Sequence, residues 1–402
     1  MSAQAARLMA GVGEMATVLP GPVPTQAPTE TPVLIVGAGP GGLAVAACLT
    51  RAGTPHVVLE QGRSVGVSWR GHYERLHLHT EKAYSSLPYV ELPDSYPRYP
   101  SRRQVVDYLE AYARHFGIVP RFGQRVVQAR RAAAGWEVQT EDHRWRARAL
   151  VVAGGWNRVP LRPTWPGIDR YQGALLHSAD YRNGGPLRGQ RVLVVGLGNS
   201  GGEIAIDLWE HGAKPTLAVR SPVNVIPREV LGMSFISVAI QQRWMPARLA
   251  DALNAPVTRL VVGDLRRWGL QRPAQGPVAQ VRESGRIPFI DIGTIGLIKK
   301  GEVAVRPGIE RFTPGGVVFT DGRAEDFNAV VLATGYRPGL QWLQTERPVL
   351  DEQGAPLASG RPCAEPGLYF CGYYISPTGM LREIAQEARQ LAGELARVAA
   401  AT

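Results

Sequence analysis

The stretch PVLIVGAGPGG, residues 32–42, decides the fold of this chain. An apolar, β-branched run that ends in glycines is typical of a buried parallel strand. Gly37, Gly39 and Gly42 then follow the G-x-G-x-x-G pattern at the start of a predicted helix, residues 41–51. In this pattern the first glycine allows a tight turn, the second lets the backbone approach a diphosphate, and the third lets helix and strand pack closely. The stretch therefore predicts a Rossmann-like unit that binds the diphosphate of a dinucleotide at its helix N-terminus.

The acid at the end of the next predicted strand, residues 56–60, indicates which dinucleotide binds there. Glu60 lies 23 residues after Gly37 and is followed by Gln61. A carboxylate at this position accepts hydrogen bonds from a ribose diol and repels a 2′-phosphate. We therefore predict that the first turn binds FAD, with Glu60 and Gln61 in the site.

The same order of strand, glycine turn, helix and strand returns 159 residues along the chain, starting with RVLVVG at 191–196. Its predicted nucleotide-binding residues are Gly196, Gly198, Asn199, Ser200 and Gly201. Where the first unit has its acid, this unit has Arg220 followed by Ser221. A cation and a hydroxyl suit the 2′-phosphate of adenosine. We therefore predict that the second turn binds NADPH in preference to NADH.

The two units predict an α/β fold with two Rossmann-like dinucleotide-binding domains. Two further apolar strands that end in glycine, LVVAGG at 150–155 and VVLATG at 330–335, each close one unit and return the chain to the other. The NADPH domain is thus expected to be inserted in the FAD domain. The predicted boundaries are a disordered leader at 1–31, the FAD domain at 32–157 and 330–402, and the NADPH domain at 158–329.

Composition narrows the class of protein. The 402 residues carry a formal net charge of +11, but the arginines are scattered along the chain, which favours anionic ligands over a nucleic-acid-binding surface. Only three cysteines occur and no C-x-x-C pair exists, so a disulfide reductase is not expected, and we assign no metal ligands. No apolar run is long enough for a membrane span. These features predict a cytoplasmic protein and leave a homodimer open.

A short signature connects the two domains and resembles a known family. The stretch YQGALLHSADY at 171–181 is similar to the F-x-G-x-x-x-H-x-x-x-Y signature of the class B flavin-containing monooxygenases, with Tyr171 in place of Phe. Within that family the chain most resembles the YUCCA-type indole-3-pyruvate monooxygenases. The stretches that carry this likeness include LHLHTEKAYSSLP, SRRQVVDYLEAYA, VLVVGLGNSGGEIAIDL, VIPREVLG, IPFIDIGTI, VVLATGY and GLYFCGY, and it spans nearly everything from Pro32 onward.

The resemblance implies an FAD- and NADPH-dependent monooxygenase that acts on a small organic substrate and O₂ through a C4a-(hydro)peroxyflavin. On resemblance alone we favour oxidative decarboxylation of an aromatic 2-oxo acid, with N- or S-oxygenation of an amine or sulfide as the alternative. A redox-silent dinucleotide-binding protein is the alternative from another class. A Baeyer–Villiger enzyme is not expected, because its signature ends in Trp where this chain has Tyr181 followed by Arg182.

The resemblance also nominates side chains around the flavin. Trp69 and His79 are predicted to line it, and His79 is the only side chain nominated for catalysis beside the flavin itself. His177 of the signature is predicted to be structural. The predicted cofactor-binding set is completed by Val126, Thr334, Gly372 and Met380, the last at the start of a C-terminal amphipathic helix.

Overall fold

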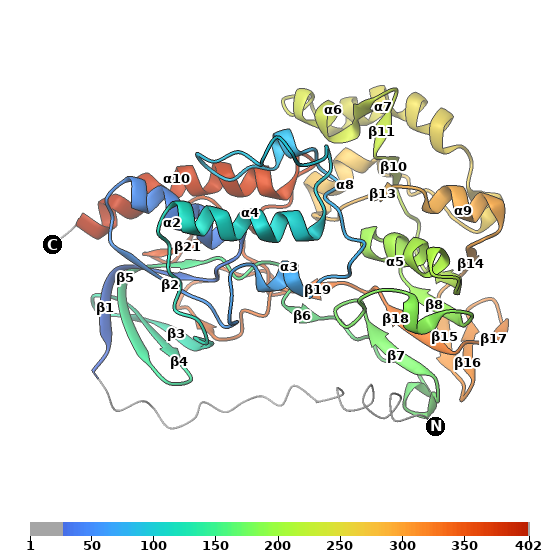
Figure 1. Ribbon diagram of the computed structural model, residues 1–402, viewed down its shortest axis with the longest axis horizontal. Coiled ribbons are helices and arrows are strands. Elements are labelled where there is room, and N and C mark those ends of the chain that lie inside the picture. Colours follow the sequence, from blue (N-terminus) through green and yellow to red (C-terminus); the bar gives the residue numbers. More distant parts are fainter. Residues whose placement is uncertain (1–26, 401–402) are drawn as a thin grey trace.

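The computed structural model describes residues 27–400 and contains two sheet-and-helix units side by side (Figure 1). The chain enters the first unit, crosses to the second after residue 152, and returns after residue 332. This is the predicted α/β architecture with one Rossmann-like unit inserted in the other, and the prediction is confirmed.

The first unit is a seven-stranded sheet with the order β2-β1-β5-β4-β3-β20, and β21 also pairs with β5. Its centre is parallel, because β1 pairs in parallel with both β2 and β5. The strands are β1 (Thr29–Val36), β2 (His56–Leu59), β3 (Val126–Ala132), β4 (Gly135–Thr140), β5 (Arg144–Val152), β20 (Leu343–Gln344) and β21 (Leu368–Phe370). The helices of this unit are α2 (Pro40–Arg51), α3 (Val67–Gly71), α4 (Arg102–His115) and α10 (Met380–Ala400).

The second unit is a five-stranded parallel sheet with the order β14-β9-β8-β18-β7. Its strands are β7 (Ala174–His177), β8 (Arg191–Val195), β9 (Lys214–Ala218), β14 (Ala304–Arg306) and β18 (Ala329–Leu332). Helices α5 (Asn199–Glu210) and α9 (Thr294–Lys300) pack on each other and belong to this unit. A small antiparallel sheet is attached to it, made of β15 (Ile309–Phe312), β16 (Gly316–Phe319) and β17 (Ala324–Asp326).

The two passages of the chain between the units lie next to each other. β6 (Val159–Pro160) pairs antiparallel with β19 (Tyr336–Arg337). Beside this pair the Leu161 amide donates to the Gly335 oxygen at 2.9 Å. The connection is therefore a two-stranded ribbon, which restricts how the units can move more than a single linker would.

Two details of the predicted organisation are wrong. β1 starts at Thr29 and pairs with β5 from there, so residues 29–31 are not part of a leader; residues 1–26 lie outside the described chain. Residues 330–332 belong to β18 in the second sheet, so the return to the first unit comes after them. Both errors have one cause: partner strands distant in the sequence decide where a strand belongs.

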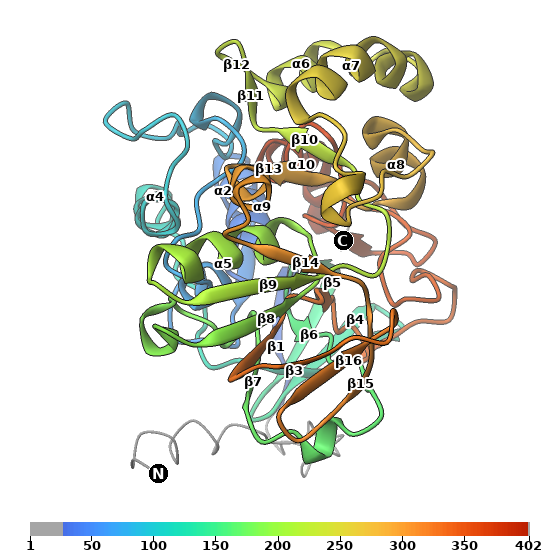
Figure 2. The same ribbon diagram turned by 90° about the vertical axis from the view of Figure 1, so that its right-hand side faces the viewer.

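The segment 229–285, which includes the stretch 229–275 that the sequence did not place, forms a helical lobe that rises beside the second sheet (Figure 2). It consists of the hairpin β11 (Glu229–Val230) and β12 (Met233–Ser234) followed by α6 (Phe235–Gln241), α7 (Ala247–Val262) and α8 (Pro277–Ser284). β10 (Val225–Pro227) and β13 (Phe289–Asp291) pair in parallel at its base. Among the described helices, none combines the length and the apolar character that crossing a membrane requires.

The core of the first unit is formed where α2 and α10 pack together over β1 and β5. α10 buries the predicted apolar stripe, but it also buries the carboxylate of Glu387, which is only 5 % exposed. The Gly372 amide donates to Glu387 Oε2 at 2.6 Å. Burial is the main cause that raises the pKa of Glu387, so this acid carries a cost at neutral pH.

We expect Glu387→Gln to stabilise the protein at alkaline pH. Because the pKa of Glu387 is raised in the folded state, the folded protein keeps a proton that the unfolded chain has lost, and stability falls as pH rises through that window. Glutamine keeps the acceptor for Gly372 and has no charge to bury. Thermal unfolding should give a higher Tm than wild type at pH 8 and a smaller difference near pH 4.5. The control is Glu394→Gln on the same helix, since Glu394 is only half-buried and pairs with Arg397 at the surface. An advantage of Glu387→Gln that is equal at both pH values would contradict the assignment.

Candidate cofactor and substrate site

A cavity of about 910 Å³ lies between the two units and is lined by residues from both. The first unit contributes its glycine turn, the segment 66–80 and the start of α10. The second contributes the N-terminal part of α5 and the lobe residues around α8. The volume is in the range of small-molecule sites, and it opens between two glycine turns.

The first turn has the geometry that each glycine of the fingerprint requires. Gly37 has φ +112°, which an L side chain rarely adopts. A Cβ at Gly42 would overlap the Gly37 carbonyl oxygen, so only glycine lets α2 start so close to β1. At Gly39 nothing lies within 4 Å of a built Cβ, and φ is −85°. The backbone at Gly39 is therefore exposed to the cavity, as close approach of a diphosphate requires.

Glu60 is oriented by the turn itself. Its carboxylate is 8 % exposed and accepts from the Ala38 amide at 2.8 Å and from the Gly62 amide at 2.7 Å. Each oxygen thus accepts one backbone hydrogen bond and retains a second lone-pair direction toward the cavity that it lines. These acceptor oxygens fit the two hydroxyl donors of a ribose diol at the first turn.

The second turn repeats this geometry. Gly196 has φ +106°, a Cβ at Gly201 would overlap the Gly196 oxygen, and nothing lies within 4 Å of a Cβ at Gly198. Asn199 and Ser200 begin α5 and line the cavity. Asn199 Oδ1 accepts from the Ile290 amide at 2.8 Å, which ties the start of α5 to β13. The second turn therefore also fits a diphosphate.

Arg220 and Ser221 follow β9 at the same edge of the sheet as the second glycine turn, since the Gly196 amide donates to the last residue of that strand, Ala218, at 2.9 Å. Both side chains are exposed and lie outside the cavity. The Arg220 guanidinium makes no ion pair within residues 27–400, and it is available to an anionic ligand.

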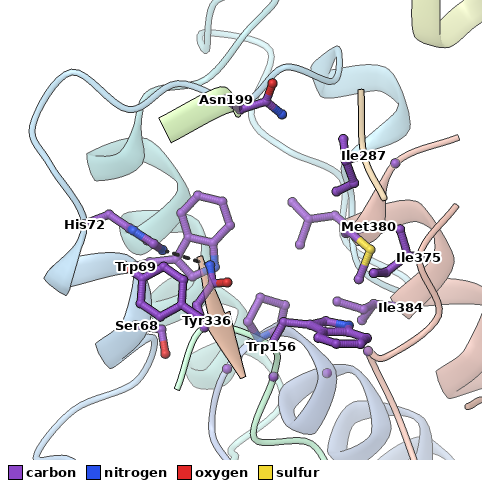
Figure 3. A pocket seen from close by; sticks show the side chains of 18 of the residues that line it. Ser68, Trp69, His72, Trp156, Asn199, Ile287, Tyr336, Ile375, Met380 and Ile384 are labelled. Carbon is purple, nitrogen blue, oxygen red and sulfur yellow. Dashed lines mark hydrogen bonds between the residues drawn. The ribbon is translucent and has the colours of Figure 1, made fainter. Parts of the chain in front are cut away.

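The remaining cavity wall is mostly aromatic and aliphatic, with Trp156 lying next to Ile384 (Figure 3). Trp69 and Tyr336 face Ile287, Ile375 and Met380 across the space. Such a wall excludes water and suits a flat, apolar ring.

The charged groups of the wall are few. Arg158 lies toward Glu60, and burial lowers the pKa of its guanidinium. Arg286 lies on the loop after α8, next to Ile287. Burial, followed by the charges of Arg182 and Arg102, lowers the pKa of His72 to about 4, so this ring is neutral at physiological pH.

His79 is joined to a buried acid that the sequence analysis did not identify. His79 Nε2 lies 2.8 Å from Oε1 of Glu203, a residue of α5 that is 1 % exposed. The buried Tyr73 also lines the cavity at this point. Acids at positions 203 and 207 on the buried face of α5 were a signal for such a site, because carboxylates rarely occupy a buried helix face without a partner.

The signature 171–181 serves the fold. The Ala179 amide donates to His177 Nδ1 at 3.1 Å, which leaves the proton on Nε2 to donate to the Gly335 oxygen at 3.2 Å. The Tyr181 hydroxyl donates to Asp207 at 2.5 Å. His177 therefore fastens the interdomain ribbon, as predicted, and lies outside the cavity.

The structure brings most predicted site residues into one cavity. Those that line it are Gly37, Gly39, Glu60, Gln61, Trp69, His79, Val126, Asn199, Ser200, Thr334, Gly372 and Met380. Those that do not are Gly42, Gly196, Gly198, Gly201, Arg220 and Ser221. Gly42 and Gly201 act in helix–strand packing. The Thr334 hydroxyl donates to the Leu161 oxygen at 2.5 Å, which gives it a structural role at the ribbon as well.

Comparison with known proteins gives a consistent result. Residues 30–352 match the family model described as Flavin-binding monooxygenase-like. The chain is 42 % identical over 340 residues to the indole-3-pyruvate monooxygenase YUCCA1 of Oryza sativa subsp. japonica, covering 82 % of this chain and 84 % of that protein. It is 38 % identical over 371 residues to the probable indole-3-pyruvate monooxygenase YUCCA1 of Arabidopsis thaliana, covering 90 % and 89 %.

Solved structures share the fold. A flavin-containing monooxygenase from Stenotrophomonas maltophilia superimposes with a TM-score of 0.71 at 23 % identity, covering 91 % of this chain and 98 % of that one. Cyclohexanone monooxygenase from Rhodococcus sp. Phi1 bound to NADP⁺ gives 0.73 at 20 % identity, covering 92 % and 85 %. At these identities the likeness concerns the arrangement of the two units.

We expect Gly39→Val to abolish FAD retention while leaving the protein folded. The backbone at Gly39 suits any residue and no protein atom meets the new Cβ, so the side chain would fill only the space of the diphosphate. The flavin-to-protein absorbance ratio of the purified variant measures retention, and circular dichroism reports folding. The control is Gly393→Val on the open face of α10. Full flavin occupancy in Gly39→Val would show that the diphosphate binds elsewhere.

We expect Arg220→Ala to weaken NADPH binding selectively. The loss of a charge-assisted hydrogen bond to the 2′-phosphate should cost about 1.5–3 kcal/mol, or roughly a 10- to 150-fold rise in KM for NADPH, with little change for NADH. Steady-state kinetics with both nucleotides checks this, and Arg323→Ala on the exposed β16–β17 turn is the control. If KM rises equally for both nucleotides, Arg220 does not contact the 2′-phosphate.

Proposed function

Since the chain belongs to the Flavin-binding monooxygenase-like family and is an FAD- and NADPH-dependent monooxygenase, we propose that its substrate is an aromatic 2-oxo acid of the indole-3-pyruvate type. The 2-oxo acid, O₂, NADPH and a proton would give the acid shorter by one carbon, CO₂, water and NADP⁺. The observation that carries this proposal is the identity of about 40 % to indole-3-pyruvate monooxygenases over most of the chain.

We further propose where the cofactors lie. FAD occupies the first turn, with its diphosphate over Gly39 and its ribose on Glu60, and the rest of the nucleotide extends through the cavity toward Met380. NADPH occupies the second turn, with its diphosphate at the start of α5 and its 2′-phosphate on Arg220. The FAD domain then comprises the first sheet and its helices, and the NADPH domain comprises the second sheet with the lobe. The acceptor oxygens of Glu60 and the open glycines described above support this assignment.

Bound FAD, once reduced by NADPH, supplies the activation of O₂. The protein's own contribution is to bind and orient the substrate and to keep water out. The apolar faces of Trp69 and Tyr336 on one side, of Ile375 and Met380 on the other, and of Trp156 beside Ile384 provide a dry space for an indole ring. This chemistry needs no nucleophilic serine or cysteine from the protein.

Arg286 is the side chain we assign to the substrate carboxylate. Of the two arginines that line the cavity, Arg158 lies toward Glu60 and therefore toward FAD. Arg286 lies on the aliphatic side, in a loop that approaches Ile375, since a Cβ at Gly285 would lie 3.8 Å from Ile375 Cδ1. Its guanidinium makes no ion pair inside residues 27–400. An unpaired arginine is suited to bidentate binding of a carboxylate.

The substrate class is tested by measuring how completely NADPH oxidation is coupled to oxygenation of each candidate substrate. NADPH consumption, H₂O₂ release and CO₂ production are measured with indole-3-pyruvate, a neutral indole, an alkylamine and a sulfide. We expect the 2-oxo acid to lower H₂O₂ release and to give CO₂ and the one-carbon-shorter acid in proportion to NADPH. Coupled turnover of the amine or sulfide, with H₂O₂ release unchanged by the 2-oxo acid, would instead identify N- or S-oxygenation.

The same assay separates the role of Arg286 from that of the flavin. Arg286→Gln should raise KM for the 2-oxo acid by about 10- to 100-fold, the usual loss for a charge-assisted contact, and should leave the oxidase rate without substrate unchanged. KM for the methyl ester of the substrate, which lacks the carboxylate charge, should be the same in Arg286→Gln as in wild type. Arg248→Gln, an exposed arginine of the same lobe outside this cavity, is the control.

A further inference from the structure

The strongest unassigned feature of the molecule is the pair formed by His79 and Glu203. The two residues come from different units: His79 follows α3 in the first, and Glu203 lies on the second turn of α5 in the second. His79 Nε2 and Glu203 Oε1 are 2.8 Å apart, and Glu203 is 1 % exposed. They form a polar contact between the units inside the cavity wall.

Each member of the pair has one polar atom left over. Glu203 Oε2 and His79 Nδ1 are buried and have no hydrogen-bond partner among residues 27–400. Tyr73 approaches both Glu203 and Ser200, and burial followed by the Glu203 charge raises the pKa of its phenol well above the ordinary value, while Glu203 Oε2 itself has no hydrogen bond within the described residues. Buried polar groups in native proteins are almost always paired. Because both residues line the cavity, the missing partner is a ligand in it.

The position of Glu203 indicates which ligand this is. α5 is the helix of the second glycine turn, and Glu203 lies one turn beyond Asn199 and Ser200. A carboxylate only accepts hydrogen bonds and repels an anion, so Oε2 requires an N–H or O–H donor and disfavours the carboxylate of the proposed substrate. The inference rests on the proposed placement of NADPH at this turn.

We propose that Glu203 and His79 bind the carboxamide of the nicotinamide ring of NADPH. The amide –NH₂ donates one hydrogen to Glu203 Oε2. With a neutral imidazole that is protonated on Nε2, His79 Nδ1 accepts the second amide hydrogen. With an imidazolium, His79 Nδ1 donates to the amide oxygen instead. In both states a primary carboxamide satisfies both leftover atoms, which neither a carboxylate nor a ketone does.

The consequence is that the nicotinamide ring is oriented by residues of both units. The Glu203–His79 contact exists only when α5 and the segment after α3 are in register, so the ring is fixed relative to the first unit rather than to its own domain alone. His79 and Glu203 are therefore positioning residues for hydride transfer. This differs from the catalytic role to which the sequence assigned His79.

The test is a binding comparison with the oxidised, FAD-loaded protein, without turnover. Isothermal titration calorimetry measures Kd for NADP⁺, for its nicotinic acid analogue, which carries a carboxylate in place of the carboxamide, and for 2′,5′-ADP, which lacks the nicotinamide. Wild type should bind NADP⁺ at least about tenfold more tightly than the acid analogue. Glu203→Gln should weaken the binding of NADP⁺ and tighten the binding of the acid analogue. The ratio of Kd for the acid analogue to Kd for NADP⁺ should therefore fall by about tenfold or more.

Two variants make the result specific. Glu210→Gln removes a carboxylate from the same helix that also pairs across the units, with Arg75 at 2.8 Å, but outside the cavity. It should leave the ratio unchanged. His79→Gln should weaken the binding of NADP⁺ and leave Kd for 2′,5′-ADP unchanged.

The outcomes are separable. An unchanged ratio in Glu203→Gln, with 2′,5′-ADP bound as in wild type, would overturn the proposal, as would an equal change in Glu210→Gln. Failure of the wild type to bind 2′,5′-ADP would instead overturn the placement of NADPH beneath it. The choice of oxygenated substrate does not enter this experiment.

Discussion

The rest of this structure depends on the close packing of a helix against the strand that precedes it, which occurs twice. At Gly42 and at Gly201 a single added carbon would overlap the carbonyl oxygen of the first glycine of the same turn. That contact places the N-termini of α2 and α5 directly at the ends of β1 and β8, where unpaired amides and the helix dipole favour an anion. Everything functional in the molecule is arranged around these two points.

The second constraint is the ribbon that joins the two units and restricts how they move relative to each other. β6 and β19 pair where the chain leaves and re-enters the first unit, and His177, Thr334 and Tyr181 fasten the surrounding segments by hydrogen bonds. The cavity of about 910 Å³ exists because the units meet along this ribbon, and neither unit encloses it alone. Its wall combines an apolar space, which excludes water, with a few charged groups whose positions differ: Glu60 at one end, Arg286 at another, and Glu203 with His79 between the units.

The sequence was most informative about this enzyme where the functional residues lie close together in the chain. The glycine fingerprints, the acid at position 60 and the arginine at position 220 depend on spacing within one strand–turn–helix–strand unit, and the structure places all of them at the predicted turns. The predictions were wrong where a partner strand that is distant in the sequence decides which sheet a residue belongs to. Thr29 joins a strand because β5 pairs with it, and residues 330–332 belong to the second sheet because β8 and β7 flank them.

Sequence by itself therefore determined two dinucleotide-binding units, their order and their cofactor chemistry. The reason is that a tight glycine turn restricts the residue types at nearby positions of its own unit, and those positions can be read from spacing alone. Only the tertiary structure decided which side chains share the cavity between them. Glu203 lies 124 residues from His79, and Arg286 lies on a loop after α8 that no motif in the sequence marks. The physical reason is that a buried charge is defined by its surroundings. Whether a carboxylate on α5 faces solvent or meets an imidazole from the other unit depends on how the two sheets are docked, and no spacing rule within either unit contains that information.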